Sequence, residues 1–267
     1  MIRSDNNLKS PTSESHSAAS NVFAKRPIWL VSVKDLAEFG DASQIGVDII
    51  DLKDPDSGPL AAATKEVWTE IAGLCRKMDT TNRPLISVAL GERQQAESVV
   101  GELPTEFTYA KAGPSGCRSS EELIALWERL RKQLRPQTEL VAVAYADFNE
   151  ANCLNPFDVL QAAKRIGLQK ILIDTFVKDG RSCTEKLTQD ELLQFDRDCK
   201  ASNFWWALAG QIRLADLPPL AAAEIQPDCL AVRGDVCDTS RTGKLSKQRL
   251  EMWRQTIESL RETNQVT

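Results

Sequence analysis

Lysine and aspartate side chains stand at the ends of two short apolar segments of the chain. One segment ends in Asp51 and Lys53, and the other ends in Asp174, with Lys178 four residues further on. Charged groups at the end of a buried strand are costly to place there, so they are candidates for function. The only histidine, His16, lies in a polar N-terminal segment. Acid–base and nucleophilic work therefore falls to Lys, Asp, Glu, Tyr or Cys, which indicates amine chemistry on carbonyl compounds.

A third lysine, Lys111, ends another apolar segment. A neutral amine can attack a carbonyl and form a Schiff base, and crowding or desolvation lowers the pKa of an ammonium group toward neutrality. Lys53, Lys111 and Lys178 would lower one another's pKa if they share one site. The alternative is that Lys53 and Lys178 only form ion pairs with Asp51 and Asp174. Six other lysines are expected to be ordinary surface residues with solvated ammonium groups: Lys34, Lys65, Lys77, Lys132, Lys164 and Lys186.

Eight short apolar segments alternate with amphipathic stretches along most of the chain. They cover residues 28–33, 47–51, 85–90, 107–111, 140–144, 170–174, 204–209 and 229–233. Such runs are typical of strands that helices cover on both faces. Eight strand–helix repeats without sequence for a second domain predict an α/β fold, a single closed (β/α)8 TIM barrel over residues 27–262. The alternative, an open doubly wound sheet, lacks its glycine fingerprint after the first segment.

Helical spacing of Leu and Trp between the strands predicts core-facing helices. We expect Ser120 to cap one helix, and Asn155 and Pro156 to begin another. Trp205 and Trp206 are expected in the core, with a contact between subunits as the alternative, so a homo-oligomer stays open.

The chain ends and the composition limit the class of protein. Residues 1–26 are rich in Ser, Asn and Thr and are expected to form a disordered tail, because Asp5 and Glu14 disfavour a transit peptide. Residues 263–267 form a short C-terminal tail. The net charge of −5 gives no reason to expect nucleic-acid binding, and no apolar run is long enough for a membrane span. Seven scattered cysteines without C-x-x-C indicate reduced thiols, a cytoplasmic protein and no metal site.

In a (β/α)8 barrel the active site lies at the carboxyl ends of the strands. The loops after the seventh and eighth strands carry Gly210 with Gln211 and Arg233 with Gly234. Glycine turns at these two positions typically hold a phosphate, to which Arg233 would add a two-point contact, so we expect a phosphorylated substrate. Ordinary turns are the alternative explanation of the glycines. Asp147, after the fifth strand, is a further candidate for binding the substrate.

Two other features near this end of the barrel have simpler interpretations. Cys117 and Cys237 have no histidine to activate them, so we do not expect nucleophilic thiols. Residues 54–58 (DPDSG) follow Lys53 directly and are typical of a turn, with a mobile flap as the alternative.

Together these motifs resemble the (5-formylfuran-3-yl)methyl phosphate synthase family, also called 4-(hydroxymethyl)-2-furancarboxaldehyde-phosphate synthases. The resemblance extends from about Ile28 to about Leu260 and is carried by DIIDLKDP (48–55), YAD (145–147), DTFVKDG (174–180), LAG (208–210) and VRG (232–234). It implies a (β/α)8 carbon–oxygen lyase that condenses two molecules of glyceraldehyde 3-phosphate into a phosphorylated furan aldehyde. That product is an early intermediate of methanofuran-type C1 carriers, and its formation needs no metal or organic cofactor.

The resemblance also implies roles for individual residues. Lys53 matches the Schiff-base lysine and Lys111 the proton acceptor, while Asp51, Asp174 and Lys178 are the remaining site residues. Two alternatives stay open on the sequence alone. One is another lysine-dependent barrel aldolase that acts on a single sugar phosphate, and the other is a non-catalytic barrel that binds a phosphorylated ligand.

Overall fold

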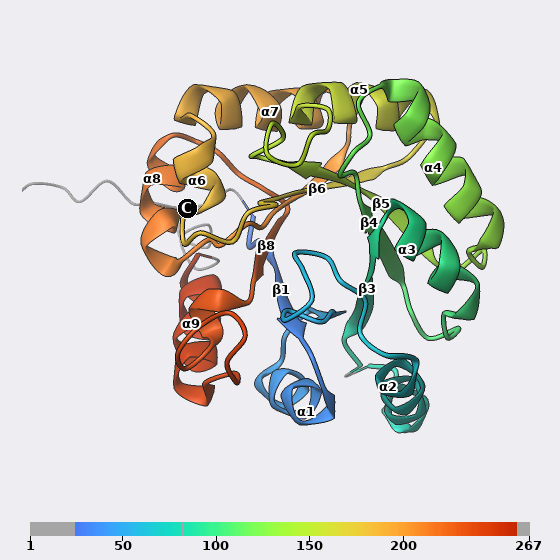
Figure 1. Cartoon of the computed structure of the whole chain (residues 1–267). Helices are drawn as coiled ribbons and strands as arrows, with labels where there is room; N and C mark the ends of the chain where they lie inside the picture. Colours follow the sequence, from blue (N-terminus) through green and yellow to red (C-terminus); the bar gives the residue numbers. More distant parts are fainter. Residues whose placement is uncertain (1–24, 82, 261–267) are drawn as a thin grey trace, which may run out of the picture.

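The computed structural model describes residues 25–81 and 83–260. Residues 1–24 of the expected tail and residues 261–267 lie outside the described residues. Eight parallel strands form a closed barrel in chain order, with β8 paired to β1 and the helices arranged around the outside (Figure 1). The strands are β1 (Ile28–Val33), β2 (Ile49–Leu52), β3 (Leu85–Glu92), β4 (Tyr109–Gly113), β5 (Glu139–Tyr145), β6 (Lys170–Asp174), β7 (Trp205–Leu208) and β8 (Cys229–Val232). The predicted (β/α)8 barrel is confirmed.

The helices follow the strands in the expected alternation. They are α1 (Leu36–Ile45), α2 (Lys65–Lys77), α3 (Arg93–Val99), α4 (Ser120–Gln133), α5 (Pro156–Arg165), α6 (Cys183–Lys186), α7 (Gln189–Ala201), α8 (Leu217–Ala222) and α9 (Lys247–Ser259), with short 3-10 helices η1 (Val100–Glu102), η2 (Leu214–Asp216) and η3 (Gly234–Val236). Asn155 caps α5 as expected. The cap of α4 is Ser119 and not Ser120, because the Ser119 side chain accepts the hydrogen bond from the backbone N–H of Glu122.

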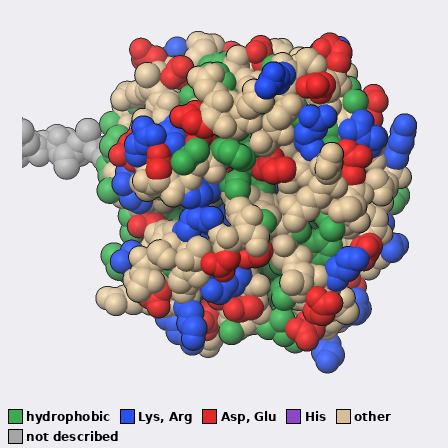
Figure 2. All heavy atoms as spheres, in the orientation of Figure 1, with side chains coloured by type: hydrophobic (Ala, Val, Ile, Leu, Met, Phe, Trp, Pro, Cys, Tyr) green, Lys and Arg blue, Asp and Glu red, His purple; other side chains and the backbone are tan. Residues whose placement is uncertain are grey.

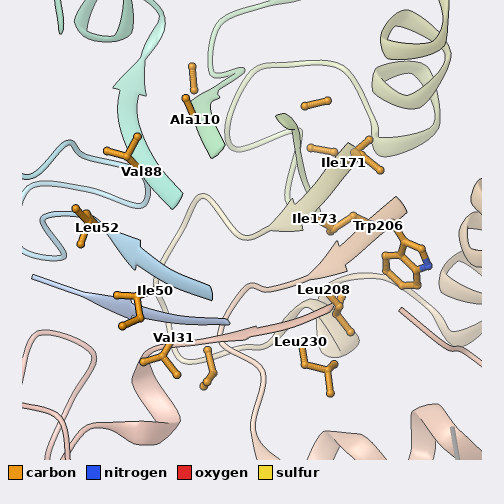
Figure 3. Close-up of a cluster of buried hydrophobic side chains, with 14 of the residues drawn as sticks. Val31, Ile50, Leu52, Val88, Ala110, Ile171, Ile173, Trp206, Leu208 and Leu230 are labelled. Carbon is orange, nitrogen blue, oxygen red and sulfur yellow. The ribbon is translucent and has the colours of Figure 1, made fainter. Parts of the chain in front are cut away.

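The core has two layers because side chains alternate along each strand. Outward-facing side chains such as Val31, Ile50 and Leu208 pack between the strands and the helices (Figure 3). Trp206 belongs to this layer and is 1% exposed, which confirms it as a core residue. Its neighbour Trp205 faces the barrel interior instead and is partly buried there.

The inner layer leaves room for a site at one end of the barrel. Several of its inward-facing side chains are only as large as alanine, and these are Ala89, Ala207, Ala209 and Ala231. A ring of small side chains cannot fill the barrel as Val, Ile and Leu do in a closed interior. A cavity therefore extends from the carboxyl ends of the strands into the barrel.

On the face of the molecule seen in Figure 2, neither acidic nor basic side chains predominate. Acidic and basic side chains are interspersed over the face seen in Figure 2. Among residues 25–81 and 83–260, no helix is long and apolar enough to cross a membrane, and no group of three or more His, Cys, Asp or Glu side chains is arranged to hold a metal ion. All seven cysteines lie within these residues and none forms a disulfide.

Candidate active site

The cavity at the carboxyl ends of the strands gathers nearly all of the expected site residues. All of them except Asp147 line it, together with Ser32, Ser87 and Arg241, which were not expected. Its polar and charged residues come from β1 to β4 and the position after β2 on one side, and from the end of β6 and the loops after β6, β7 and β8 on the other. The bottom of the cavity is apolar, with Leu30, Ile49, Val141 and Leu172.

Asp51 and Lys111 form a buried ion pair between β2 and β4. The ammonium group of Lys111 is in direct contact with Asp51 Oδ1 and donates to Ser87 Oγ at 3.0 Å. The hydroxyl of Ser32 donates to Asp51 Oδ2 at 2.9 Å. Each charge is therefore compensated without water, and the pair is held by hydroxyls from both sides.

The strand register explains why the two serines reach this pair. Ser32 and Ser87 are the ladder partners of Asp51 on the two neighbouring strands. Side chains at paired positions of a parallel sheet point to the same face, here the barrel interior. In the sequence, Ser32 and Ser87 could be noticed only as polar residues within apolar segments. Their place in the site follows once their strand register with Asp51 is known.

Asp174 and Lys178 form a second ion pair after β6. Lys178 Nζ lies 2.7 Å from Asp174 Oδ1 and 3.1 Å from Thr175 Oγ1, and the backbone N–H of Thr175 donates to the same carboxylate oxygen. Burial alone would raise the pKa of Asp174, but Lys178 and Lys53 outweigh it and lower that pKa below its usual value. Asp174 is therefore ionised at neutral pH.

Lys53 lies between the two ion pairs and has no partner of its own. Its ammonium group makes no hydrogen bond or ion pair with the residues that the structure describes, although the residue is only 8% exposed. The pKa of Lys53 is lowered to about 8, chiefly by burial; the positive charges of Lys178 and Lys111 act in the same direction, and the carboxylates of Asp174 and Asp51 oppose it. The alternative of simple ion pairs is confirmed for Lys178 with Asp174. It is wrong for Lys53 with Asp51, because Lys111 occupies that carboxylate.

The two-point phosphate contact expected of Arg233 does not fit the structure. Its guanidinium is buried and donates to the Glu38 carboxylate on α1, with Nη1 at 2.8 Å from Oε2 and Nη2 at 3.3 Å from Oε1. Its other N–H groups donate to the carbonyl oxygens of Ser32, Arg241 and Gly243. All five N–H donors of the guanidinium are thus used within the protein, so Arg233 binds the scaffold and not a phosphate.

The predicted substrate contact of Asp147 is also wrong. Its carboxylate supports the loop after β6 instead. Its two oxygens accept from the backbone N–H groups of Phe176 and Val177 at 2.6 and 2.8 Å. Lys186 Nζ lies 3.1 Å from the same carboxylate and 3.3 Å from Asp179. The side chain of Lys186 is 4% exposed, so its expected surface position is wrong as well. This cluster fixes the loop that carries Lys178.

Gly210 and Gln211 hold the same loop from the other side. Gly210 has a φ of +75°, and a Cβ there would lie 2.3 Å from Cys183 Sγ and 2.8 Å from the Thr175 backbone nitrogen. Only glycine permits this close approach. The side-chain amide of Gln211 donates to the carbonyl oxygen of Arg181 at 2.7 Å, while its oxygen accepts from Gly180. Both residues line the cavity, and their contact to a phosphate stays a prediction.

The remaining expectations near the mouth concern thiols and the turn after Lys53. Cys117 and Cys237 are buried, and burial raises the pKa of each to about 11, which keeps both thiols protonated. Residues 54–58 form the expected turn, in which Asp54 accepts from the backbone N–H of Asp56.

Comparison with known proteins decides the family. The family model described as 4-HFC-P synthase matches residues 29–254. The chain belongs to the 4-HFC-P synthase family. A (5-formylfuran-3-yl)methyl phosphate synthase of Methanococcus maripaludis is 31% identical over 218 residues, which cover 79% of this chain and 89% of that protein. The corresponding synthase of Methanopyrus kandleri is 29% identical over 216 residues, covering 80% and 90%.

Solved structures support the fold of this 4-HFC-P synthase family member and nothing more specific. KGPDC from Streptococcus mutans aligns with a TM-score of 0.59 and 13% identity over 88% of this chain and 99% of that one. The (S)-3-O-geranylgeranylglyceryl phosphate synthase of Thermoplasma acidophilum, in complex with sn-glycerol-1-phosphate, gives a TM-score of 0.57 and 12% identity over 88% and 94%.

Proposed function

We propose that this protein is a (5-formylfuran-3-yl)methyl phosphate synthase that condenses two molecules of glyceraldehyde 3-phosphate. It is then a carbon–oxygen lyase acting on phosphates, and its product serves the biosynthesis of a methanofuran-type C1 carrier in the cytoplasm. Membership of the family and the names of its relatives support the reaction. The observation that carries the mechanism is the unpaired amine of Lys53, buried between two lysine–aspartate ion pairs.

The first step is attack of the Lys53 amine on the aldehyde carbon of one triose phosphate. Loss of water from the resulting carbinolamine gives an imine, which withdraws electrons from the neighbouring carbon and makes its C–H acidic. A pKa of about 8 leaves a useful fraction of Lys53 neutral near physiological pH, whereas a lysine at 10.5 would be almost entirely protonated.

The buried Asp51–Lys111 pair is the proposed acceptor of the proton from that carbon. Lys111 matches the proton acceptor of the family, and its direct contact with Asp51 fixes its side chain at the wall of the cavity. The hydroxyls of Ser32 and Ser87 orient the pair without competing for the substrate. Asp174 and Lys178 would move protons on the opposite side of the imine.

The enamine formed in this way attacks the aldehyde of the second triose phosphate, and phosphate leaves from the first. Two molecules of glyceraldehyde 3-phosphate then give one phosphorylated furan aldehyde, one phosphate and two waters, which balances all atoms. Formation of an aromatic ring makes the late dehydrations favourable. The main task of the protein is therefore the first carbon–carbon bond and the positioning of two phosphorylated molecules.

A product assay tests this function. Purified protein is incubated with glyceraldehyde 3-phosphate, while furan-aldehyde absorbance, released phosphate and product mass are followed. The proposal predicts a phosphorylated furan aldehyde and one phosphate released for each product molecule. A folded protein that leaves the substrate unchanged, or that gives only an aldol without a furan, contradicts it. The latter outcome would favour a barrel aldolase that acts on a single sugar phosphate.

A further inference from the structure

The loop between β8 and α9 is fixed by contacts within its own base and by a contact to the segment after β1. Cys237 and Leu245 form an antiparallel bridge at its base, and Asp238 donates its backbone N–H to the carbonyl oxygen of Lys244 at 2.9 Å. Lys34, after β1, donates to the carbonyl oxygen of Thr242 at 2.9 Å. The loop therefore has a defined position at the mouth of the cavity.

The buried side chain of Arg233 holds the backbone of this loop in place through two hydrogen bonds. Its Nε donates to the carbonyl oxygen of Arg241 at 2.6 Å, and its Nη2 donates to that of Gly243 at 3.1 Å. Glu38 neutralises the buried guanidinium at the same time. The side chain that the sequence suggested for phosphate binding thus places the backbone of another arginine, Arg241.

The guanidinium of Arg241 lies at the cavity without a partner. Of the five cationic side chains that line the cavity, Lys111, Lys178 and Arg233 are each paired with a carboxylate. Within residues 25–81 and 83–260, neither Arg241 nor Lys53 has a hydrogen bond or an ion pair for its charged group. The cavity therefore presents two uncompensated cations, and they differ in chemistry.

Lys53 and Arg241 match the two ends of a phosphorylated aldehyde, which carries a carbonyl at one end and a phosphate at the other. The Lys53 amine can lose its proton and attack a carbonyl, whereas a guanidinium stays charged and offers a planar fork of donors that matches phosphate oxygens. Partial burial lowers the pKa of Arg241, the charge of Asp174 opposes this, and the charge of Arg233 adds to the lowering; no carboxylate of the described residues forms an ion pair with the guanidinium. An anion entering the cavity would supply that missing charge.

We propose that Arg241 is the phosphate-binding residue of this cavity and selects phosphorylated aldehydes for Lys53. The proposal rests on the proposed function only for the identity of the aldehyde. Phosphate recognition follows from the arrangement of charges and is testable without product formation.

Imine trapping with two aldehydes tests this role. Borohydride reduces the Lys53 imine to a stable adduct, whose yield is measured by mass spectrometry over a range of glyceraldehyde 3-phosphate or of unphosphorylated glyceraldehyde. The variants are Arg241→Gln, which removes the charge, and Arg241→Lys, which keeps the charge without the fork. Arg118→Gln is the control, because Arg118 is exposed before α4 and does not line the cavity.

The expected result is selective for the phosphate. Arg241→Gln should raise the half-saturating concentration of glyceraldehyde 3-phosphate by about tenfold or more, the effect of losing a charge-assisted contact, and leave trapping of glyceraldehyde within about twofold. Arg241→Lys should show a smaller loss, and Arg118→Gln none. Two results would overturn the proposal. An equal weakening of trapping with both aldehydes would mean that Arg241 acts on folding or on Lys53, and unchanged trapping with both would mean that Arg241 does not contribute to binding.

A second measurement separates this proposal from the synthase reaction. Calorimetric titration with inorganic phosphate should show binding to the wild-type protein and at least about tenfold weaker binding to Arg241→Gln. Failure of the wild-type protein to bind phosphate, or equal affinity of the two proteins, contradicts the role of Arg241. Phosphate binding that depends on Arg241 in a protein that makes no furan would uphold this proposal and contradict the proposed function alone.

Discussion

The two sides of the active-site mouth are built in different ways. On the β1–β4 side, Ser32, Asp51, Ser87 and Lys111 all lie within strands and meet through the ladder register. On the β6–β8 side, the cavity residues Lys178 and Arg241 lie in loops. Those loops are held by a second set of polar contacts, which are made by Asp147, Lys186, Gln211 and Arg233.

This difference suggests a division of tasks. Strand positions hold the Asp51–Lys111 pair with little freedom, as proton transfer requires. Loop positions, fixed by the supporting contacts, place the cation of Arg241 at the mouth of the cavity, where a phosphate enters. Lys53 stands between the two sides, just beyond the end of β2, where its backbone N–H donates to the carbonyl oxygen of Val33 at 3.1 Å.

The largest effect is expected from substitution of Lys53, which lies between the two sides. Lys53→Ala should lower the rate of furan formation by roughly three orders of magnitude or more, because no other unpaired amine lines the described cavity. Steady-state product formation measures this, with circular dichroism to confirm the fold. Lys65→Ala, which changes an exposed lysine on α2, is the matched control and should keep its activity. Near-normal turnover of Lys53→Ala would remove the imine from the mechanism.

The two ion pairs should respond unequally to loss of their lysines. Lys111→Met leaves Asp51, which is 1% exposed, without its counter-ion and should lower the free energy of unfolding by about 3–5 kcal/mol. Lys178→Met should cost less, because the backbone N–H of Thr175 still donates to Asp174 and Lys53 lies nearby. Urea unfolding of both variants measures the difference. Equal losses would contradict the distinction between the strand side and the loop side.

The pH dependence of imine formation should report Lys53. Since burial lowers its pKa to about 8, the rate of trapping should rise about tenfold per pH unit below pH 8 and level off above it. Borohydride trapping at a fixed, subsaturating aldehyde concentration measures this profile. A rise that continued to pH 10 would indicate an ordinary solvated lysine and would contradict the buried, unpaired amine.

The lowered pKa of Lys53 also makes the stability of the protein depend on pH. The unfolded chain binds the Lys53 proton more tightly than the folded protein, so the unfolding free energy rises with pH between about 8 and 10.5. Lys53→Met should therefore be more stable than the wild-type protein at pH 7, by roughly 3 kcal/mol, and this gain should shrink as the pH approaches 10.5. Thermal unfolding at several pH values measures the gain, and a destabilised Lys53→Met at pH 7 would argue against it.

The smallest effect is expected from the support of the loop side. Asp147→Asn keeps a side-chain oxygen for one loop N–H but loses the charge that Lys186 neutralises. Activity should fall by about tenfold through misplacement of Lys178, with about 1–3 kcal/mol lost in stability. Glyceraldehyde 3-phosphate kinetics combined with urea unfolding test this. Unchanged kinetics would mean that the loop position does not depend on Asp147.

The same two sides differ in how far the sequence predicts them. Apolar runs predict the eight strands, and a spacing of two places Asp51 and Lys53 at the mouth because strand periodicity is local. The role of Arg233 could not be predicted, since it is decided by Glu38 on α1, 195 residues away in sequence. The predictions for Asp147 and Lys186 were wrong for the same reason. The sequence does not distinguish a charged side chain that pairs with another loop from one that binds substrate or faces water.

The proposed mechanism is tested most directly by locating the imine. Wild-type protein is treated with glyceraldehyde 3-phosphate and borohydride, digested, and mapped by tandem mass spectrometry. Attack by the Lys53 amine predicts a single reduced triose adduct on Lys53, with Lys111 and Lys178 unmodified. An adduct on Lys111 or Lys178, or continued furan formation by a protein that yields no adduct at all, would contradict it.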